Sequence, residues 1–379
     1  MLLAVVLLLV ACAAPPAQMP PAATLFEDRH FSPPAVRPDA GEVFRLSDAM
    51  RSYLEHDLAP LLRRRGTREG LIAALYNGDN LKLEYDAAYT RNAAEAFDAR
   101  SGNCLSLVIM TAAFARALDL QVYFNRVSID EQWRLSGNLM MAAGHVNLSL
   151  GRHRLGDRGY RIDHLLTIDF LPAVELKRQR SDPIDEDTVV GMYMNNRAAE
   201  LLADERIDEA YWWAREAILK APAEIAGYNT LAVVYLRRGL EQPAEQVLKL
   251  ALQRQPDNTR LLGNLVNLLQ RQGRGSEHAL YAQRLRALEP IAPYRDFHLG
   301  QAALDEGRFV DALQLFGQEL KRSPEQPEAH FGIARAYLAL GRIELARRHL
   351  LAAREFSSSR GEAALYTAKL GRLPASRVQ

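Results

Sequence analysis

The sequence has few of the features that reveal a function at once. Only two of its 379 residues are cysteines, Cys12 and Cys104, so a disulfide framework is excluded. Neither sign of charge is in excess, since 47 basic residues face 46 acidic ones, and this balance gives no footprint for nucleic acid. No metal-ligand spacing, glycine-rich phosphate loop or serine elbow stands out. The sequence therefore implies neither a cofactor nor a metal.

The first apolar run, MLLAVVLLLVA at residues 1–11, is too short for a membrane-spanning helix but matches the hydrophobic part of a secretory signal. It ends in Leu9-Val10-Ala11-Cys12, which resembles the lipobox of bacterial lipoproteins. This resemblance implies a signal peptide over residues 1–12, a lipid anchor on Cys12 and, with Ala13 next, an outer-membrane lipoprotein facing the periplasm. The alternative is an ordinary cleaved signal with which Cys12 is lost.

The rest of the chain divides by composition. Residues 13–46 concentrate proline and small residues, which predicts an extended tether. The composition, with 48% hydrophobic and 25% charged residues, is that of a globular protein long enough for two domains. We expect these domains at residues 47–180 and 189–373.

The second region carries a 34-residue period. Prolines recur at this spacing, and so do glycines that suit a turn with positive φ: Pro222, Pro256, Pro290 and Pro324; Gly239, Gly273, Gly307 and Gly341. Because 34 residues is the tetratricopeptide (TPR) period, we predict an all-α TPR solenoid of about five repeats. In the third repeat His278 stands where alanine is expected and Ala279 follows it, which predicts a local slip of register.

Such a solenoid buries each helix pair only against its neighbours and leaves a groove lined by the first helix of each repeat. The pattern therefore favours binding of a protein or peptide partner in that groove. The alternatives are a structural spacer and a dimerisation surface.

The first region contains the other cysteine at the start of an apolar segment. Cys104 follows Ser101-Gly102-Asn103 and precedes LSLVIMTAAFARALDL, which is apolar on nearly all sides and predicts a buried helix. At the first turn of a helix, free backbone N–H groups and the positive dipole end stabilise a thiolate. Cys104 is thus either a nucleophile or a small buried hydrophobe.

Two strand-like segments supply candidate partners for this thiol. In MMAAGHVNLSL, alternation places His145, Asn147 and Ser149 on one face, away from the apolar residues between them. In YRIDHLLTIDFLP, Asp169 lies between Ile168 and Phe170, and an antiparallel pairing would set its carboxylate beside the His145 imidazole. Asp163 and His164 of the same segment are the alternative partners.

These motifs resemble the transglutaminase-like branch of the papain-like cysteine protease superfamily. The matching residues are Gly102-Asn103-Cys104, Arg116-Ala117-Leu118 at the end of the helix, and Asp169-Phe170-x-Pro172. The resemblance implies an α+β papain-like fold, with Cys104 as nucleophile, His145 as acid and base, and Asp169 orienting the imidazole. Asn147 stands where this family often has an aromatic residue.

The chemistry that this resemblance implies is attack of the Cys104 thiolate on an amide carbonyl to give a thioester. Water would resolve the thioester in a peptidase or amidase, whereas a lysine amine would resolve it in a crosslinking acyltransferase. We therefore expect a lipid-anchored periplasmic thiol hydrolase with a partner-binding TPR solenoid. The alternatives are a catalytically inactive TPR scaffold of the envelope and the crosslinking enzyme.

Overall fold

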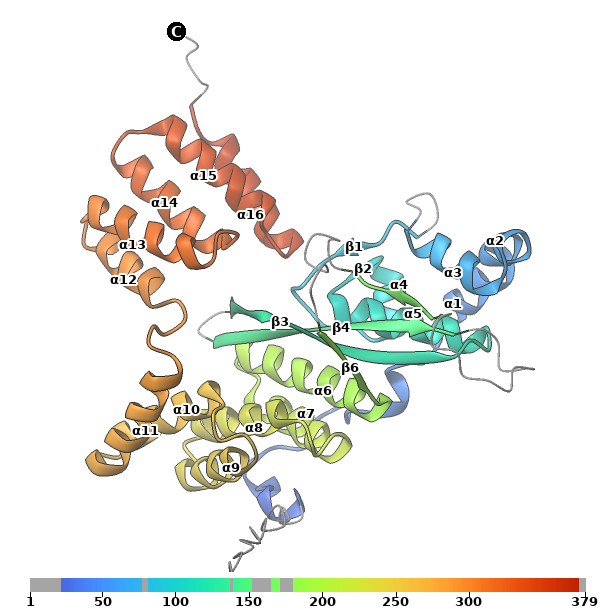
Figure 1. Cartoon of the computed structure of the whole chain (residues 1–379), viewed down its shortest axis with the longest axis horizontal. Coiled ribbons are helices and arrows are strands. Elements are labelled where there is room, and N and C mark those ends of the chain that lie inside the picture. Colours follow the sequence, from blue (N-terminus) through green and yellow to red (C-terminus); the bar gives the residue numbers. More distant parts are fainter. Residues whose placement is uncertain (1–21, 77–80, 137–138, 152–164, 171–179, 375–379) are drawn as a thin grey trace, which may run out of the picture.

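The computed structural model describes residues 22–76, 81–136, 139–151, 165–170 and 180–374. It contains a mixed helix-and-sheet part followed by an array of helices (Figure 1). The predicted signal peptide with Cys12 lies outside the described residues, as do Asp163, His164 and Pro172.

Short helices and strands make up the N-terminal part. Its helices are η1 (Ala22–Leu25), η2 (Asp28–His30), η3 (Ala40–Glu42), α1 (Asp48–Ser52), η4 (Tyr53–Leu58), α2 (Ala59–Arg65), α3 (Thr67–Tyr76), α4 (Ala93–Ala99) and α5 (Cys104–Ala117). Its strands are β1 (Glu84–Tyr85), β2 (Ser101–Gly102), β3 (Val122–Ser136), β4 (Leu139–Leu150), β5 (Leu166–Ile168) and β6 (Arg180–Ile184).

Four strands form one antiparallel sheet in the order β5-β4-β3-β6. In β3 and β4, Val122 pairs with Leu150, and the register shifts between Val127 and Gln132. β5 pairs with the end of β4, with Ile168 opposite Leu148. The short strands β1 and β2 run parallel and bring Tyr85 beside Gly102, two residues before the cysteine.

Helix α5 forms the centre of the N-terminal core. Every residue from Leu105 to Ala115 is buried, which agrees with the apolar character of this segment on all its sides. Val146, Leu148 and Leu150 of β4 belong to the same cluster, so α5 packs against the sheet through the apolar side of that strand. This packing fixes the direction in which the first turn of α5 points.

The C-terminal part consists of helix pairs that pack in two groups, one ending near residue 288 and the other beginning near residue 294 (Figure 1). The first helices are α6 (Glu186–Ala203), α8 (Ile225–Arg238), α10 (Thr259–Arg271), α12 (Arg295–Asp305) and α14 (Pro327–Ala339). The second helices are α7 (Ile207–Lys220), α9 (Glu241–Arg254), α11 (Gly275–Leu288), α13 (Phe309–Arg322) and α15 (Ile343–Glu355), followed by α16 (Arg360–Gly371). The all-α solenoid that the 34-residue period predicts is confirmed.

Glycines recur in the solenoid for two physical reasons. Gly239 closes α8 with φ of 80°, a conformation that costs glycine little. Gly332 allows a close approach of helices, since a Cβ there would lie 2.5 Å from the Cζ of Phe316. The spacing in the sequence therefore reflects both the turns and the contacts between helices.

The expected register slip in the third repeat is wrong. The second helices begin at Ile207, Glu241, Gly275, Phe309 and Ile343, which keeps the 34-residue interval through this repeat. Ala279 is exposed, and only Ala282 of α11 is buried. The helix keeps its place because the turn at Gly273 precedes it at the usual interval, and it is simply packed less tightly than its counterparts.

The tether predicted over residues 13–46 does not extend to residue 46. Phe31 is 5% exposed and its ring stacks on that of Tyr211 of α7, with centroids 3.9 Å apart and planes 3° from parallel. The Tyr235 hydroxyl donates to the Leu25 carbonyl at 2.6 Å. The aromatic side chains between the prolines, which the composition argument overlooked, bury themselves against the solenoid.

Helix α6 contributes to two hydrophobic cores. Val189, Val190 and Tyr193 near its start belong to the core around α5, whereas Leu201 and Leu202 near its end belong to the core of the next helices. The first repeat is thus packed against the N-terminal part. The domain limits at residues 180 and 189 remain predictions.

The end of the solenoid returns to the N-terminal part. α16 begins beside β1 (Figure 1), where the Ala87 backbone N–H donates to the Ser358 carbonyl at 2.8 Å. Arg360 and Glu84 form an ion pair with 2.7 Å between Nη2 and Oε2. Both ends of the helical array therefore contact the part of the chain that carries Cys104.

Candidate functional site

Cys104 is the first residue of α5, and the residues before it form a tight cap. The Asn103 side chain accepts a hydrogen bond from the Ser106 backbone N–H at 2.9 Å. Gly102 must be glycine, because a Cβ there would lie 2.6 Å from the Ser106 Cβ. The Cys104 side chain is partly exposed at the helix N-terminus.

His145 and Asp169 lie next to each other. His145 Nε2 is 2.7 Å from Asp169 Oδ1, and both side chains are buried, at 2% and 7% exposure. Continuing the β4–β5 register by one residue sets Asp169 opposite Asn147, so the carboxylate reaches His145 diagonally. The structure thus brings together the two residues that the sequence paired.

Asparagine side chains hold the second oxygen of Asp169. Asn147 Nδ2 donates to Asp169 Oδ2 at 2.9 Å, and Asn125 Nδ2 donates to Asn147 Oδ1 at 3.0 Å. Because the Asp169 carboxylate interacts with His145 through one oxygen and with Asn147 through the other, its orientation is fixed. Asn147 therefore has a structural role that the sequence did not indicate.

The thiol lies within reach of this pair. Cys104 Sγ donates to the Gly144 carbonyl at 3.9 Å, one residue before His145. Burial lowers the pKa of the His145 imidazole, but the hydrogen bonds that it makes with Asp169 and Cys104 outweigh burial and raise the pKa to about 9. Since Asp169 is bound to Nε2, Nδ1 is the ring nitrogen left to face Cys104.

Tyr76 at the end of α3 holds the backbone of Asp169. Its hydroxyl donates to the Asp169 carbonyl at 2.8 Å and accepts from the Asp169 N–H at 3.2 Å. Its ring stacks on Phe170, with centroids 6.3 Å apart. A tyrosine 93 residues away in the chain gave no local signal of this role.

The arrangement has the elements of acyl-transfer chemistry on a thiol. A thiol at a helix N-terminus, an imidazole and a carboxylate lie close together in that order. Within the described part of the chain, no group of three or more histidine, cysteine, aspartate or glutamate residues could hold a metal ion. No described helix is long and apolar enough to cross a membrane.

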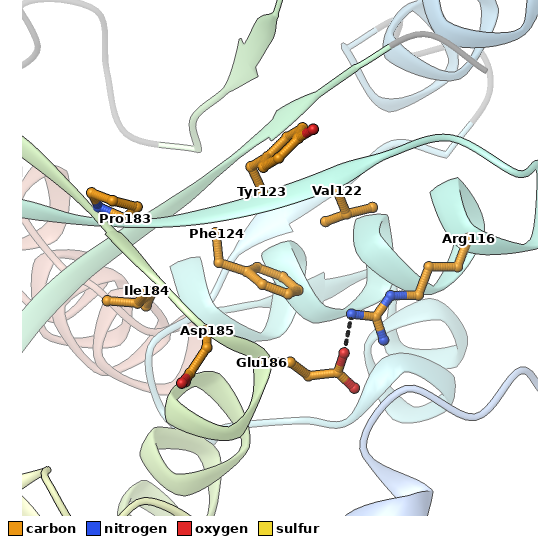
Figure 2. Close-up of a pocket in the computed structure, with 8 residues that line it drawn as sticks. All are labelled: Arg116, Val122, Tyr123, Phe124, Pro183, Ile184, Asp185 and Glu186. Carbon is orange, nitrogen blue, oxygen red and sulfur yellow. Dashed lines mark hydrogen bonds and ion pairs between the residues drawn. The ribbon is translucent and has the colours of Figure 1, made fainter. Parts of the chain in front are cut away.

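A separate hollow of about 180 Å³ lies at the other end of α5 (Figure 2). Arg116, Phe124 and Ile184 line it, and the Arg116 guanidinium is paired with Glu186 across it at 2.5 Å. Twelve residues of helix, about 18 Å, separate Arg116 from Cys104. The hollow is therefore no part of the Cys104 site.

Comparison with known proteins concerns the solenoid. A family model described as tetratricopeptide repeat matches residues 303–366. No curated protein matches the chain.

Solved structures with similarity include two that are described as TPR proteins. YrrB, described as a TPR protein with an unusual peptide-binding site, is 20% identical over 48% of this chain and 92% of its own, with a TM-score of 0.26. TTC0263 of Thermus thermophilus is 21% identical over 48% of this chain and 98% of its own, with a TM-score of 0.31. For pilF of Pseudomonas aeruginosa, the identity is 20% over 50% of this chain and 93% of its own, with a TM-score of 0.28. These values are too low to say anything about ligands. The C-terminal region of this chain carries tetratricopeptide repeats.

Proposed function

We propose that this chain is a TPR scaffold that binds a protein or peptide partner through the first helices of its repeats. The observation that carries this proposal is the TPR region itself, which the family match and the helix pairs support. TPR solenoids expose an extended surface of first helices, and this surface suits an extended peptide or a partner helix.

A photo-crosslinking side chain placed at single exposed positions in cells tests the scaffold. Asn267 lies on α10, a first helix, and Gln253 lies on α9, a second helix, and both are exposed. We expect a discrete cross-linked product from position 267 and none from position 253. Equal cross-linking from both positions, or none from either, would contradict partner binding by the first helices.

A second function is favoured by the Cys104, His145 and Asp169 geometry. We propose a transglutaminase-like thiol hydrolase on an α+β papain-like domain, acting on peptide or side-chain amides. The Cys104 sulfur bonds to the amide carbon, and the protonated His145 gives its proton to the departing amine as the C–N bond breaks. Water then attacks the thioester, His145 takes its proton, and the acid leaves as the thiolate re-forms.

The buried His145–Asp169 pair is the observation that supports this chemistry, because it holds a proton at the imidazole for the leaving group. A lysine amine in place of water would give the crosslinking acyltransferase. Incorporation of a labelled primary amine into a protein substrate would distinguish transfer from hydrolysis.

Alkylation of Cys104 by iodoacetamide across pH 5–9 tests the thiol site. A thiol without help is protonated well below its usual pKa of about 8.5 and reacts slowly there. We expect fast alkylation at pH 6 in the wild type, its loss in His145→Ala, and no change in His56→Ala, whose histidine is exposed. A Cys104 that reacts only after unfolding, or is indifferent to His145→Ala, leaves the scaffold as the function.

The proposed setting of both functions is the periplasmic face of the outer membrane, with Cys12 lipidated as the lipobox resemblance implies. The mass of the purified mature chain and its release from membranes by Cys12→Ser test this anchor. A mature chain whose mass includes no acyl groups would contradict the lipid anchor.

A further inference from the structure

A hydrogen-bonded path leads from the first solenoid helix to the residue before Cys104. Glu200 of α6 accepts from the Thr90 backbone N–H, with 2.6 Å between Oε1 and N. Thr90 Oγ1 in turn accepts from Asn103 Nδ2 at 2.8 Å. Asn103 caps α5, so three residues connect the solenoid with the turn that presents the thiol.

The path is partly buried and its groups are paired. Thr90 is 1% exposed, and the Glu200 side chain is 11% exposed. The second Glu200 oxygen accepts from Arg197 Nη1 at 2.7 Å. Both carboxylate oxygens are therefore occupied, one by the solenoid and one by the segment that flanks Cys104.

The same segment is tied to α5 at a second point. The Arg91 backbone N–H donates to Ser106 Oγ at 2.8 Å, and the Ser106 hydroxyl donates to Asn103 Oδ1 at 2.8 Å. A shift of Thr90 would thus be passed to Asn103 and Ser106 together. The position of the cap depends on where Glu200 holds Thr90.

We propose that Glu200 is a positioning residue for Cys104, acting from the first TPR helix through Thr90 and Asn103. Glu200 touches no reacting atom. It fixes the segment against which the Asn103 cap is aligned, and through it the direction of the thiol toward His145. This inference rests on the proposed thiol chemistry, and it makes α6 a part of the site that carries that chemistry.

The test compares variants of the full-length soluble chain by the pH profile of iodoacetamide alkylation at Cys104. Glu200→Ala removes the acceptor for Thr90, and we expect the rate at pH 6 to fall roughly threefold to tenfold, the equilibrium factor that corresponds to the stability a helix cap contributes. Glu200→Gln keeps a carbonyl oxygen for Thr90 and should retain most of the rate. Thr90→Val keeps the side-chain shape and the backbone N–H but removes the link to Asn103, and it should match Glu200→Ala.

Asn195→Ala is the matched control on the same helix. Asn195 Oδ1 accepts from Thr230 Oγ1 at 2.7 Å, on the side of α6 that faces α8. We expect this variant to keep the wild-type profile. Thermal unfolding of each variant shows whether it is folded, and Thr90→Val carries the test if Glu200→Ala is not.

The outcomes separate the two proposals. A reactive wild type with unchanged Glu200→Ala and Thr90→Val, or an equal loss in Asn195→Ala, overturns the positioning role alone. A wild-type thiol that is inert at pH 6 overturns the thiol chemistry and the positioning role together.

Discussion

Asn147 and Asp169 are joined side chain to side chain, with 2.9 Å between Asn147 Nδ2 and Asp169 Oδ2. The other oxygen of this carboxylate lies 2.7 Å from His145 Nε2. The asparagine thus turns the carboxylate edge toward the imidazole, as a positioning group does in acyl-transfer sites.

Replacing Asn147 by alanine should weaken the His145–Asp169 pair. Because the buried Asp169 Oδ2 loses a donor, we expect alkylation of Cys104 at pH 6 to fall by roughly tenfold, as for loss of one charge-assisted hydrogen bond. Thr167→Ala is the control, since Thr167 lies two residues before Asp169 but its side chain bonds to Ser149. Equal rates in both variants would contradict this role.

The His145 imidazole should make folding stability depend on alkaline pH. Its pKa is raised to about 9 from 6.5, so the folded protein holds the proton more tightly. The resulting stability is fully present below pH 6.5 and is lost as pH rises through about 9. This loss of unfolding free energy is on the order of 1 to 3 kcal/mol. Urea unfolding of wild type and Asp169→Asn at pH 6.5 and 9.5 measures it.

Asp169→Asn removes the charge that raises the His145 pKa, so the alkaline loss should shrink in that variant. The His56→Ala variant, which changes an exposed histidine, should keep the wild-type loss. An identical loss of stability at alkaline pH in all three proteins would mean that groups other than His145 cause it.

Phe31 should anchor the N-terminal segment to the solenoid. Phe31→Ala leaves a cavity beside Tyr211 and should lower the free energy of unfolding by about 3 kcal/mol, as for other buried aromatics. Val36 is 81% exposed, and Val36→Ala should cost less than about 0.5 kcal/mol. Chemical denaturation measures the change in unfolding free energy for both variants. Equal changes would contradict the anchoring role of Phe31.

Two histidines between α14 and α15 should destabilise the end of the solenoid in acid. His330 Nδ1 lies 3.1 Å from His349 Nδ1, and burial, His330 and Arg348 lower the pKa of His349 to about 4. A lowered histidine pKa means that the unfolded chain binds the proton first. The pair's contribution to stability is therefore full above pH 6.5 and is lost as pH falls toward about 4.

Thermal unfolding between pH 7 and 4.5 checks this dependence. We expect a smaller acid loss in His349→Gln than in wild type, and the wild-type loss in His298→Gln, whose histidine is exposed. If His349→Gln follows the wild-type curve, the pair does not govern the acid response.

The contact of α16 with β1 should keep the C-terminal end of the helical array in contact with the N-terminal part. Arg360→Glu places two like charges together with Glu84, but both side chains are more than half exposed. We expect a change of less than about 0.5 kcal/mol in unfolding free energy. The radius of gyration from small-angle X-ray scattering should increase in Arg360→Glu and stay constant in Arg354→Glu, and an unchanged radius in both would contradict the contact.

Local patterns in the sequence predicted much of the fold. The 34-residue spacing of Gly239 and its counterparts predicts the turns, because only a residue that tolerates positive φ closes these helices cheaply. The apolar segment after Cys104 predicts a buried helix, and Asn103 predicts its cap. Alternation placed His145 on the polar face of its strand, whereas its pairing with Asp169 was suggested by the transglutaminase-like resemblance.

The same patterns failed where contacts between distant segments decided the outcome. Proline-rich composition predicts an extended chain over residues 13–46, yet Phe31 finds an aromatic surface on α7. His278 suggested a slip, but the turn at Gly273 keeps the helix in place.

The sequence by itself determined the repeat period and the helix that begins at Cys104, because propensity, periodicity and capping act over a few residues. Only the tertiary structure decided that Tyr76 holds Asp169, that Asn147 orients its carboxylate and that Glu200 reaches Thr90 from 110 residues away. Those contacts depend on which faces of separate elements meet. The packing of whole cores decides which faces meet, and no short sequence pattern encodes that packing.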